Sequence, residues 1–214
     1  MFPFRNDDDL DGIKELLTAE FRKVRVKKPL LPKIKIVSVR SYFDTINKEY
    51  VNAHIIKNNP FIGNLASTSR EPIEFLFSYN INNRKTLIVR CSPLIRAAIH
   101  KNGDRLKIGV SLCRVYDRIH VLQCNKCSRF GHHHNNCKAE EVFCAHCSEK
   151  HSSRDCPHKK NTQHHSCINC LLSKTESIKI NATKHNAFSF QCPLYINERN
   201  RIISRTEFGI KPSF

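Results

Sequence analysis

The chain has 214 residues, of which 40% are hydrophobic and 26% charged, and its 36 Lys and Arg against 19 Asp and Glu give a formal net charge of +17 at pH 7 with histidine neutral. That length allows one or two domains, and a content of only 6 Gly and 9 Pro excludes a low-complexity or collagen-like chain. The charge favours an acidic partner, either a nucleic acid or an anionic membrane surface. No run of about 18 apolar residues occurs, which argues against a membrane span. The residues near Met1 have no apolar signal core, which argues against secretion.

Residues 1–32 are expected to form a basic N-terminal arm. Within it, Asp11–Arg25 has apolar residues at roughly helical spacing, and Pro29 and Pro32 follow as helix terminators. Runs of charge are most often solvated, so a solvated arm is favoured over an extension that contacts phosphates. The basic cluster consists of Arg22, Lys23, Arg25, Lys27 and Lys28.

Residues 33–120 alternate between strand and helix patterns. Alternating and β-branched residues indicate the strands, while Ser92 as a cap, Pro93 at the first helical position and Gly103 at the far end delimit the second helix. In chain order, the predicted elements are a strand over Lys33–Val39, a helix over Asp44–Ile56, strands over Ile73–Tyr79 and Lys85–Cys91, a helix from Pro93, and a strand over Arg105–Val115. This βαββαβ order predicts an α+β domain of the ferredoxin-like type, which includes RNA-recognition motifs.

The same patterns assign side chains to faces. Asp44 is expected to cap the first helix. Apolar spacing places Ile46, Tyr50, Val51 and Ile55 on one face of that helix, and Leu106, Ile108, Val110 and Leu112 on one face of the last strand.

Aromatic residues are missing from the two central strands of the predicted sheet, Ile34–Val37 and Thr86–Arg90. RNA-recognition motifs stack bases on aromatic side chains of such strands, so base stacking on this sheet is not expected. The aromatic residues of the second strand, Phe75, Phe77 and Tyr79, are expected in a packed core. The sheet would then serve protein association or orient the segment that follows.

Cysteine dominates the segment from residue 121 onward. The chain has 11 cysteines, and nine of them lie between residues 124 and 192, interleaved with histidines. An odd count mixed with histidine indicates metal binding in a reducing compartment and not a disulfide framework. Apolar periodicity fades here, so bound metal would supply the order that a core cannot. Cys91 and Cys113 fall in predicted strands and are expected to be core thiols.

The spacing predicts three zinc ions, each held by three cysteines and one histidine, because Zn²⁺ prefers four tetrahedral thiolate and imidazole ligands. Gly131 allows the backbone to fold back before the first histidine. The predicted ligands are Cys124, Cys127, His132 and Cys137 in a knuckle over residues 121–138, Cys144, Cys147, His151 and Cys156 in a knuckle over 142–158, and Cys167, Cys170, His185 and Cys192 in an atypical knuckle over 165–194, with a tail or short helix over 195–214.

Other histidines compete for three of these positions. They are His133 and His134 for the first knuckle, His146 and His158 for the second, and His164 and His165 for the third. Sites with four protein ligands are structural and leave no place for a reacting water. The sequence has no HExxH, Walker loop or GxSxG motif and lacks the zinc-deaminase strings, so no enzymatic activity is expected. Three thiolates and one Zn²⁺ sum to −1 per site, which takes the net charge from +17 to about +14.

Small knuckles of this type bind single strands through basic side chains and an apolar or aromatic platform for bases. For Phe130, stacking on a base is favoured over packing against the metal loops. For Phe143, packing against the metal loops is favoured over stacking on a base. The candidate nucleic-acid contacts are Lys126, Arg129, Phe130, Phe143, Lys150, Arg154, Lys159 and Lys160.

The order of these parts resembles the Gag-like protein encoded by the first reading frame of non-LTR (LINE-type) retrotransposons, particularly the arthropod branches. The resemblance covers residues 33–205, and its specific part is the threefold Cys/His run, from Cys124-Asn125-Lys126-Cys127 through Cys167-Ile168-Asn169-Cys170 to Cys192-Pro193-Leu194-Tyr195. It implies an RRM-like domain, CCHC knuckles, binding of RNA or single-stranded DNA, nucleic-acid chaperoning, and self-association with the element's transcript into a ribonucleoprotein particle.

Two other functions fit the same residues. One is a host zinc-knuckle protein acting in RNA processing or translation, and the other is a protein-interaction module in which zinc only shapes a docking surface. The expected location is the cytoplasm, with the nucleus as a further compartment, and no membrane partner is expected.

Overall fold

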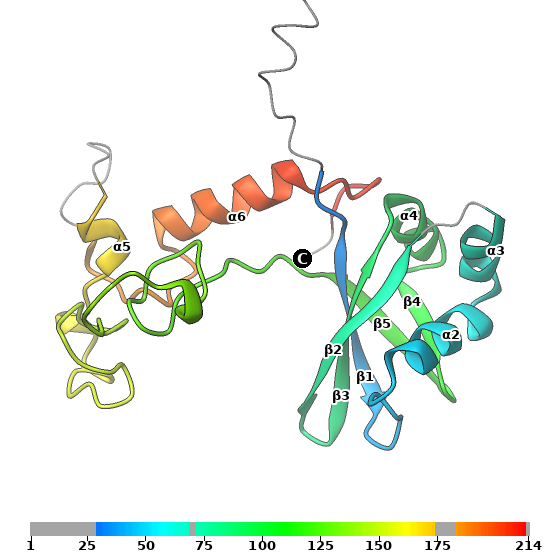
Figure 1. Ribbon diagram of the computed structural model, residues 1–214, viewed down its shortest axis with the longest axis horizontal. Helices are drawn as coiled ribbons and strands as arrows, with labels where there is room; N and C mark the ends of the chain where they lie inside the picture. Colours follow the sequence, from blue (N-terminus) through cyan, green and yellow to red (C-terminus); the bar gives the residue numbers. More distant parts are fainter. Residues whose placement is uncertain (1–28, 69–71, 174–182, 213–214) are drawn as a thin grey trace, which may run out of the picture.

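The computed structural model describes residues 29–68, 72–173 and 183–212. The helix expected over Asp11–Arg25 lies outside these residues. The described chain is a mixed α+β protein with a five-stranded antiparallel sheet, a Cys/His-rich segment and a long C-terminal helix (Figure 1). Over these three ranges, no helix has both the length and the apolar character needed to cross a bilayer.

The sheet domain begins at β1 and ends at β5. Its strand order is β2-β3-β1-β5-β4, with every neighbouring pair antiparallel. The expected order had one helix after the first strand and one strand after the last helix. The structure instead has two helices after the first strand and two strands after the last helix of the domain. The elements are β1 (Lys33–Arg40), α2 (Lys48–Asn58), α3 (Pro60–Thr68), β2 (Ile73–Ile81), β3 (Arg84–Cys91), α4 (Pro93–Lys101), β4 (Arg105–Ile108) and β5 (Ser111–Asp117).

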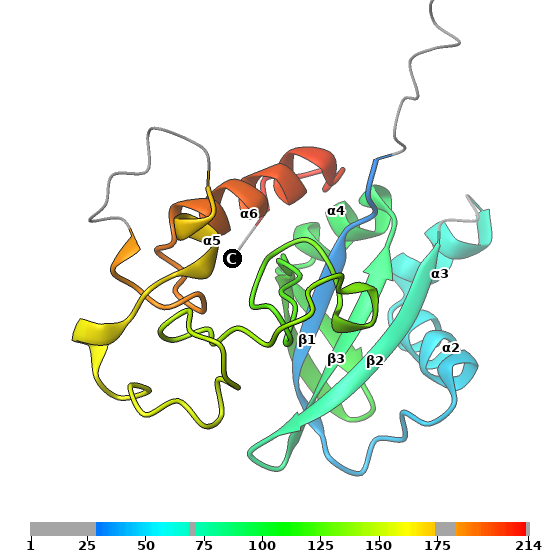
Figure 2. The ribbon, with the colours of Figure 1, turned by 60° about the vertical axis from the view of Figure 1, so that its left-hand side comes forward.

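The core of this domain lies between the sheet and its helices. Alternate residues of the central strands, such as Ile34 and Ile36 on β1 and Leu87 and Val89 on β3, are fully buried in one cluster. Helices α2, α3 and α4 lie on that face of the sheet (Figure 2). The opposite face carries no helix of the domain, and we call it the open face.

Helix α4 begins where the sequence predicts. The Ser92 side chain accepts a hydrogen bond from the Ile95 N–H at 3.2 Å, and Pro93 occupies the first turn. Gly103 adopts a φ of +74°, a left-handed conformation that favours glycine. Cap, proline and glycine therefore delimit this helix as predicted.

Helix α2 begins later than predicted. Asn47 is the N-cap, and its side chain accepts the Tyr50 N–H at 2.9 Å. Asp44 instead accepts the Ile46 N–H at 2.8 Å in a turn before the helix, and Ile46 is 94% exposed. The prediction of Ile46 on the buried face, with Tyr50 beside it, is therefore wrong, while Val51 is buried as expected.

The single strand predicted over Arg105–Val115 is two strands. Gly109 takes a φ of +58° in a turn between β4 and β5, which pair as a hairpin. A turn resets which side chains face the core, because alternation holds only along one continuous strand. Ile108 is therefore buried, whereas Val110 and Leu112 are exposed, contrary to the prediction.

A bulge in β2 overturns the expected core position of two aromatic residues. Phe75 lies opposite Val89 and is buried, but the register shifts after it, so that Phe77 lies opposite Ile88. An extra residue in one strand turns the following side chains to the other face. Phe77 and Tyr79 consequently lie on the open face, 45% and 40% exposed.

The C-terminal segment returns to the sheet domain. Helix α6 (Pro193–Arg205) runs from the Cys/His-rich segment back to the start of β1 (Figure 1). The Leu30 N–H donates to the Arg205 carbonyl at 2.8 Å, and the Glu207 N–H donates to the Leu30 carbonyl at 3.0 Å. Phe208 is buried, and a Cβ on Gly209 would lie 2.8 Å from the Pro93 carbonyl oxygen. The Cys/His-rich segment is thus joined to the sheet domain at both ends. At one end the chain leaves β5, and at the other the residues after α6 contact the sheet domain.

Candidate metal centres

Three clusters of three cysteines and one histidine lie in the segment between β5 and α6. In each cluster the candidate ligand atoms all lie within 4.8 Å of one another. These are the same three groups of four that the spacing predicts. They consist of Cys124, Cys127, His132 and Cys137 (site 1), Cys144, Cys147, His151 and Cys156 (site 2), and Cys167, Cys170, His185 and Cys192 (site 3).

The separations within the clusters match a tetrahedral zinc site. With Zn–S near 2.3 Å and Zn–N near 2.0–2.1 Å, tetrahedral angles place two sulfur ligands about 3.8 Å apart and a sulfur and a nitrogen about 3.5 Å apart. The Sγ–Nε2 distances between the cysteine and histidine of a pair are 3.3 Å in site 1, 3.5 Å in site 2 and 3.6 Å in site 3. The Sγ–Sγ distance between Cys147 and Cys156 in site 2 is 3.8 Å, and Cys192 in site 3 lies 3.8 Å from Cys167 and 3.5 Å from Cys170.

These sulfur separations also exclude disulfides. A disulfide requires an S–S distance of about 2.05 Å, and every cysteine of the described chain is a free thiol. Cys91 and Cys113 are buried in the sheet domain, as predicted. Burial raises the pKa of the Cys91 thiol to about 12, which keeps it protonated and unreactive.

Sites 1 and 2 are built on the same backbone turn. In site 1 the Ser128 N–H donates to the Cys124 carbonyl at 2.8 Å, and in site 2 the Ser148 N–H donates to the Cys144 carbonyl at 3.0 Å. Both serines have a positive φ, 58° and 68°. Gly131 has a φ of +95°, which confirms the expected need for glycine before the first histidine.

In each cluster one cysteine has a lowered thiol pKa. Burial opposes ionisation of Cys127, but hydrogen bonds from the Arg129 backbone and side chain outweigh it and lower its pKa to about 7. The pKa of Cys144 is lowered in a similar balance between burial and backbone N–H donors. In site 3 the Cys167 thiol, as a hydrogen-bond donor, lowers the pKa of Cys192. A thiolate is the form that binds zinc, so these three cysteines suit the first step of metal capture.

The first two sites are joined by a pair of hydrogen bonds and not by a free linker. The Phe143 N–H, just before site 2, donates to the Lys126 carbonyl at 2.9 Å. The Ser128 hydroxyl then donates to the Phe143 carbonyl at 2.7 Å. The entry to site 2 is therefore fixed on the turn of site 1.

The same pair of bonds repeats between sites 2 and 3. The Ser166 N–H, just before site 3, donates to the His146 carbonyl at 2.8 Å, and the Ser148 hydroxyl donates to the Ser166 carbonyl at 2.7 Å. Lys126 and His146 occupy equivalent places in the two Cys-x-x-Cys turns. The three sites thus stack by one repeated backbone relation.

Site 3 also contacts site 1 and closes the stack. Asn169, on the short helix α5 (Ile168–Leu171), accepts the Phe130 N–H at 3.1 Å and donates to the Ser128 carbonyl at 3.0 Å. The Ala187 N–H donates to the Ala145 carbonyl of site 2 at 2.7 Å. A small buried cluster around these residues includes three ligands of site 3, so we treat the whole as one Cys/His module.

The competing histidines lie outside the clusters. His133 and His134 contact each other on the surface beside site 1, and His158 stacks on His164. His146 and His165 are largely buried, with ring centres 5.5 Å apart. Within the described chain, Nδ1 of His146 and Nε2 of His165 have no hydrogen-bond partner. None of the six belongs to a group of candidate ligands among the described residues.

Both candidate stacking residues pack on the module. Phe143 and Phe130 are partly buried against its apolar cluster, and the Phe130 ring meets Tyr195 edge to face with ring centres 6.0 Å apart. Phe130 also lines an open hollow of about 360 Å³ at site 1, together with Arg129, His132, Asn136 and Lys138. One part of the Phe130 ring is therefore structural and another is accessible.

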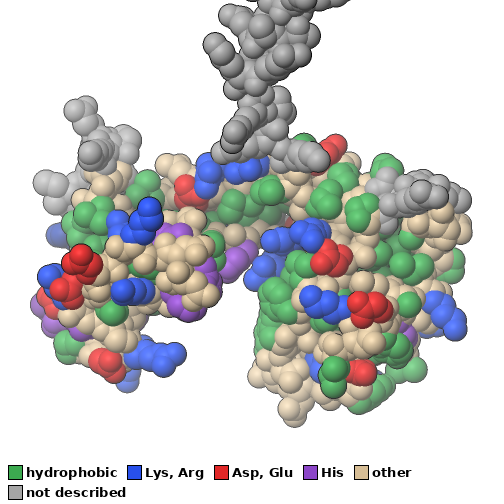
Figure 3. All heavy atoms as spheres, in the orientation of Figure 1, with side chains coloured by type: hydrophobic (Ala, Val, Ile, Leu, Met, Phe, Trp, Pro, Cys, Tyr) green, Lys and Arg blue, Asp and Glu red, His purple; other side chains and the backbone are tan. Residues whose placement is uncertain are grey.

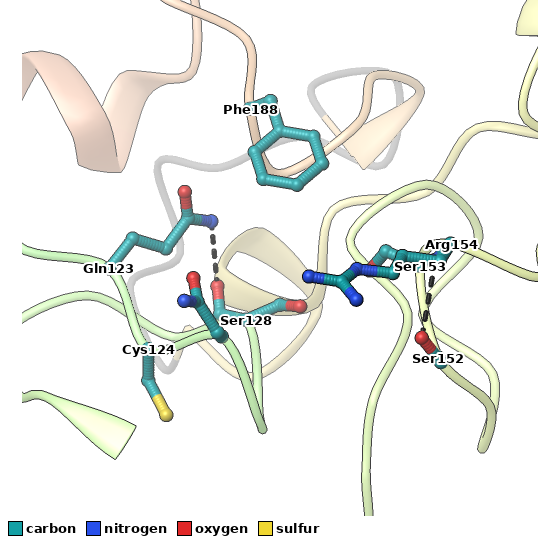
Figure 4. A pocket seen from close by; sticks show the side chains of 8 residues that line it. Gln123, Cys124, Ser128, Ser152, Ser153, Arg154 and Phe188 are labelled. Carbon is teal, nitrogen blue, oxygen red and sulfur yellow. Dashed lines mark hydrogen bonds between the residues drawn. The ribbon is translucent and has the colours of Figure 1, made fainter. Parts of the chain in front are cut away.

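A second hollow of about 250 Å³ lies between the three sites. Gln123 and Ser128 come from site 1, Arg154 from site 2 and Phe188 from the segment of site 3, and their side chains surround one space (Figure 4). Phe188 is 52% exposed. Arg154 is one of the predicted nucleic-acid contacts, whereas Phe188 was not among them, because a single phenylalanine in a loop carries no periodic signal.

The remaining predicted contacts are dispersed over the module. Arg129, Lys159 and Lys160 are exposed, and Lys126 is partly exposed. Lys150 is exposed and lies 3.4 Å from a carboxylate oxygen of Glu141. The structure thus brings Arg129 and Arg154 to hollows and leaves the four lysines as a diffuse positive surface.

Comparison with known proteins finds no matching family model, no matching curated protein and no matching solved structure.

Proposed function

We propose that this protein is a zinc-dependent, non-enzymatic binder of single-stranded nucleic acid, RNA above all. The observation that carries the proposal is the set of three Cys₃His clusters with tetrahedral ligand separations, stacked into one module with hollows lined by cationic and aromatic side chains. Four protein ligands per ion make the sites structural. When bound, zinc supplies the cross-links that hold the module together.

The chain's own residues provide the binding chemistry. Arg129 and Lys138 beside Phe130, and Arg154 beside Phe188, pair a cation with an aromatic ring. A ring offers a stacking platform that every base can use, and the cation neutralises the adjoining phosphate. Binding by this means is strong in low salt and tolerant of sequence.

The finer part of the proposal is a Gag-like role. The order β2-β3-β1-β5 with helices on one face is compatible with an RRM-like domain elaborated by α3 and β4. Together with the threefold Cys/His run, it supports a protein that packages a retrotransposon transcript into a ribonucleoprotein particle, chaperones nucleic acid and self-associates. We propose that it acts in the cytoplasm and enters the nucleus.

Binding of a fluorescent oligouridylate to the zinc-loaded full chain tests the function. We expect the logarithm of the affinity to fall linearly with the logarithm of salt concentration, with a slope near −0.7 per phosphate contact. Phe130→Ala should weaken binding by about 1–3 kcal/mol with zinc content unchanged, if the accessible part of the ring stacks on a base.

Tyr42→Ala is the matched control, because Tyr42 is an exposed aromatic residue of the sheet domain. It should leave the affinity unchanged. A flat salt dependence with no retention of the oligomer would count against nucleic-acid binding and in favour of a zinc-shaped protein-docking module.

A further inference from the structure

Three cationic side chains lie side by side across the open face of the sheet. Arg90 of β3 lies opposite Lys33 of β1. Arg118 follows β5 and lies beside Lys33, because the Arg118 N–H donates to the Lys33 carbonyl at 2.8 Å. The neighbours Val89 and Ile34 face the core, so alternation places Arg90 and Lys33 on the open face. Arg118 lines the same pocket as both of them.

This row is costly for folding. Like charges opposite each other on neighbouring strands destabilise a sheet. Arg90 is paired with Glu74 at 3.1 Å, but no carboxylate of the described chain forms an ion pair with Lys33 or Arg118. Burial, followed by the charges of Arg118 and Arg90, lowers the pKa of Lys33. An anion bound here would relieve the repulsion.

The row lies at the wall of a pocket of about 370 Å³ between the open face and α6. Lys33, Arg90 and Arg118 line it together with His120, and Ile202 and Thr206 of the C-terminal helix and its cap form another wall. Figure 3 shows Lys and Arg side chains gathered on this side of the sheet domain, below the C-terminal helix. The pocket is therefore both strongly cationic and open to a ligand from solvent.

Aromatic rings adjoin this cationic row. The bulge in β2 turns Phe77 to the open face, and the Arg118 guanidinium lies 5.5 Å from the centre of its ring. On β5, on the other side of β1, the ring centre of Tyr116 lies 5.2 Å from Lys35 Nζ. Cationic side chains and aromatic rings thus lie next to one another on one surface, the combination by which proteins bind single strands.

We infer that the pocket below α6 binds a phosphate group of a single-stranded nucleic acid through Lys33, Arg90 and Arg118, with the adjoining base on Phe77. This inference rests on the proposed function and extends the binding surface from the Cys/His module onto the sheet. A guanidinium binds phosphate in a bidentate manner, and lysine adds a point charge. The aromatic platform comes from β2 and β5 and not from β1 and β3.

The salt dependence of oligouridylate binding to the zinc-loaded full chain tests the inference. Arg118→Gln and Lys33→Gln should each make the log–log slope less steep by about 0.7, the value for one lost phosphate contact. Lys101→Gln is the matched control, since Lys101 is an exposed cation at the end of α4, on the helix-covered side. It removes the same charge and should leave the slope unchanged.

Two forms of the oligomer distinguish the source of the phosphate. If both variants change the slope for an oligomer without a terminal phosphate, the pocket holds a backbone phosphate. If they do so only for the 5′-phosphorylated form, it holds a chain end. Unchanged slopes in both variants, with normal binding by the wild type, would overturn the inference and leave the proposed function standing. Failure of the wild type to bind either oligomer would overturn the proposed function itself.

Discussion

Replacing Cys192 by serine is expected to weaken metal binding at all three Cys/His sites, and not at the third alone. Cys192 Sγ is fully buried and lies 3.8 Å from the Cys167 sulfur and 3.5 Å from the Cys170 sulfur. Loss of this thiolate removes one of four ligands and frees the segment that carries it. Metal binding at sites 1 and 2 is weakened as well, because this segment and α5 hold those two sites in place.

Three hydrogen bonds carry that coupling. Ala187 donates to Ala145 in site 2, and Asn169 bonds both Phe130 and Ser128 in site 1. At about 0.5–1.5 kcal/mol each, their loss should lower the affinities of sites 1 and 2, taken together, by tenfold or more, since about 1.4 kcal/mol corresponds to a factor of ten. Release of zinc to a graded series of chelators measures this.

The matched control is Cys113→Ser. Cys113 is buried in the sheet domain, outside the three clusters, and its thiol lies 3.8 Å from the Ser111 carbonyl, a partner that serine can keep. This variant should bind three ions as tightly as the wild type. If Cys192→Ser keeps two ions with unchanged affinity, the sites are independent knuckles and the module described above is wrong.

Arg96→Met should destabilise the sheet domain by about 3–5 kcal/mol, the usual cost of removing one partner of a buried ion pair. Arg96 is fully buried on α4. Its Nε and Nη2 donate to the two carboxylate oxygens of Asp117 at 2.7 and 2.9 Å, and its Nη1 donates to Asp104 at 2.7 Å. Methionine keeps the volume but leaves the buried Asp117 carboxylate without its guanidinium partner.

Urea unfolding of the zinc-loaded chain, followed by far-ultraviolet circular dichroism, measures the change. The double variant Arg96→Met with Asp117→Leu should recover much of the loss, because an apolar pair is often as stable as a buried ion pair. Arg105→Met, at an exposed position of β4, is the control and should change little. A single variant as stable as the wild type would show that the pair does not hold α4 to β5.

The same network of ion pairs predicts how the stability of the sheet domain changes with pH. Burial opposes ionisation of Asp104, but hydrogen bonds from His100 and Arg96 outweigh it and lower the pKa of Asp104. A lowered carboxyl pKa contributes stability above its unfolded value, and that stability is lost as the pH falls through the folded value. The sheet domain should therefore weaken on acidification below the ordinary range of aspartate.

Local chemistry in the sequence predicted much of the fold. Ser92, Pro93 and Gly103 delimit α4 because cap, fixed φ and left-handed turn each depend on one residue. The twelve clustered side chains were predictable because chelation by one ion constrains spacing directly. Where a single residue type determines the local geometry, the sequence pattern is sufficient to predict the structure.

The errors arise where the backbone changes register. Gly109 lies within an unbroken apolar alternation, so the turn there has no signal apart from the glycine itself. The β2 bulge depends on pairing with β3, which is a property of two strands and not of one. It moved Phe77 from the expected core to the open face, where the ring is 45% exposed.

The arrangement of the three sites relative to one another also could not be predicted from the sequence. Bonds such as Phe143 N–H to Lys126 O join backbone atoms, which every residue possesses. The cationic row is hidden for a related reason, because Lys33, Arg90 and Arg118 are far apart in the chain and meet only once the strand order is known. Both features depend on tertiary structure.

The number of zinc ions bound by the purified, reduced full chain decides whether the three Cys/His clusters are metal sites. Native mass spectrometry counts bound metal and subunits in one spectrum and separates zinc-bound thiolates from disulfides by mass. We expect three zinc ions per chain and no disulfide, in keeping with the three four-residue clusters. One ion or none per chain, or cystine in place of the metal, would contradict it.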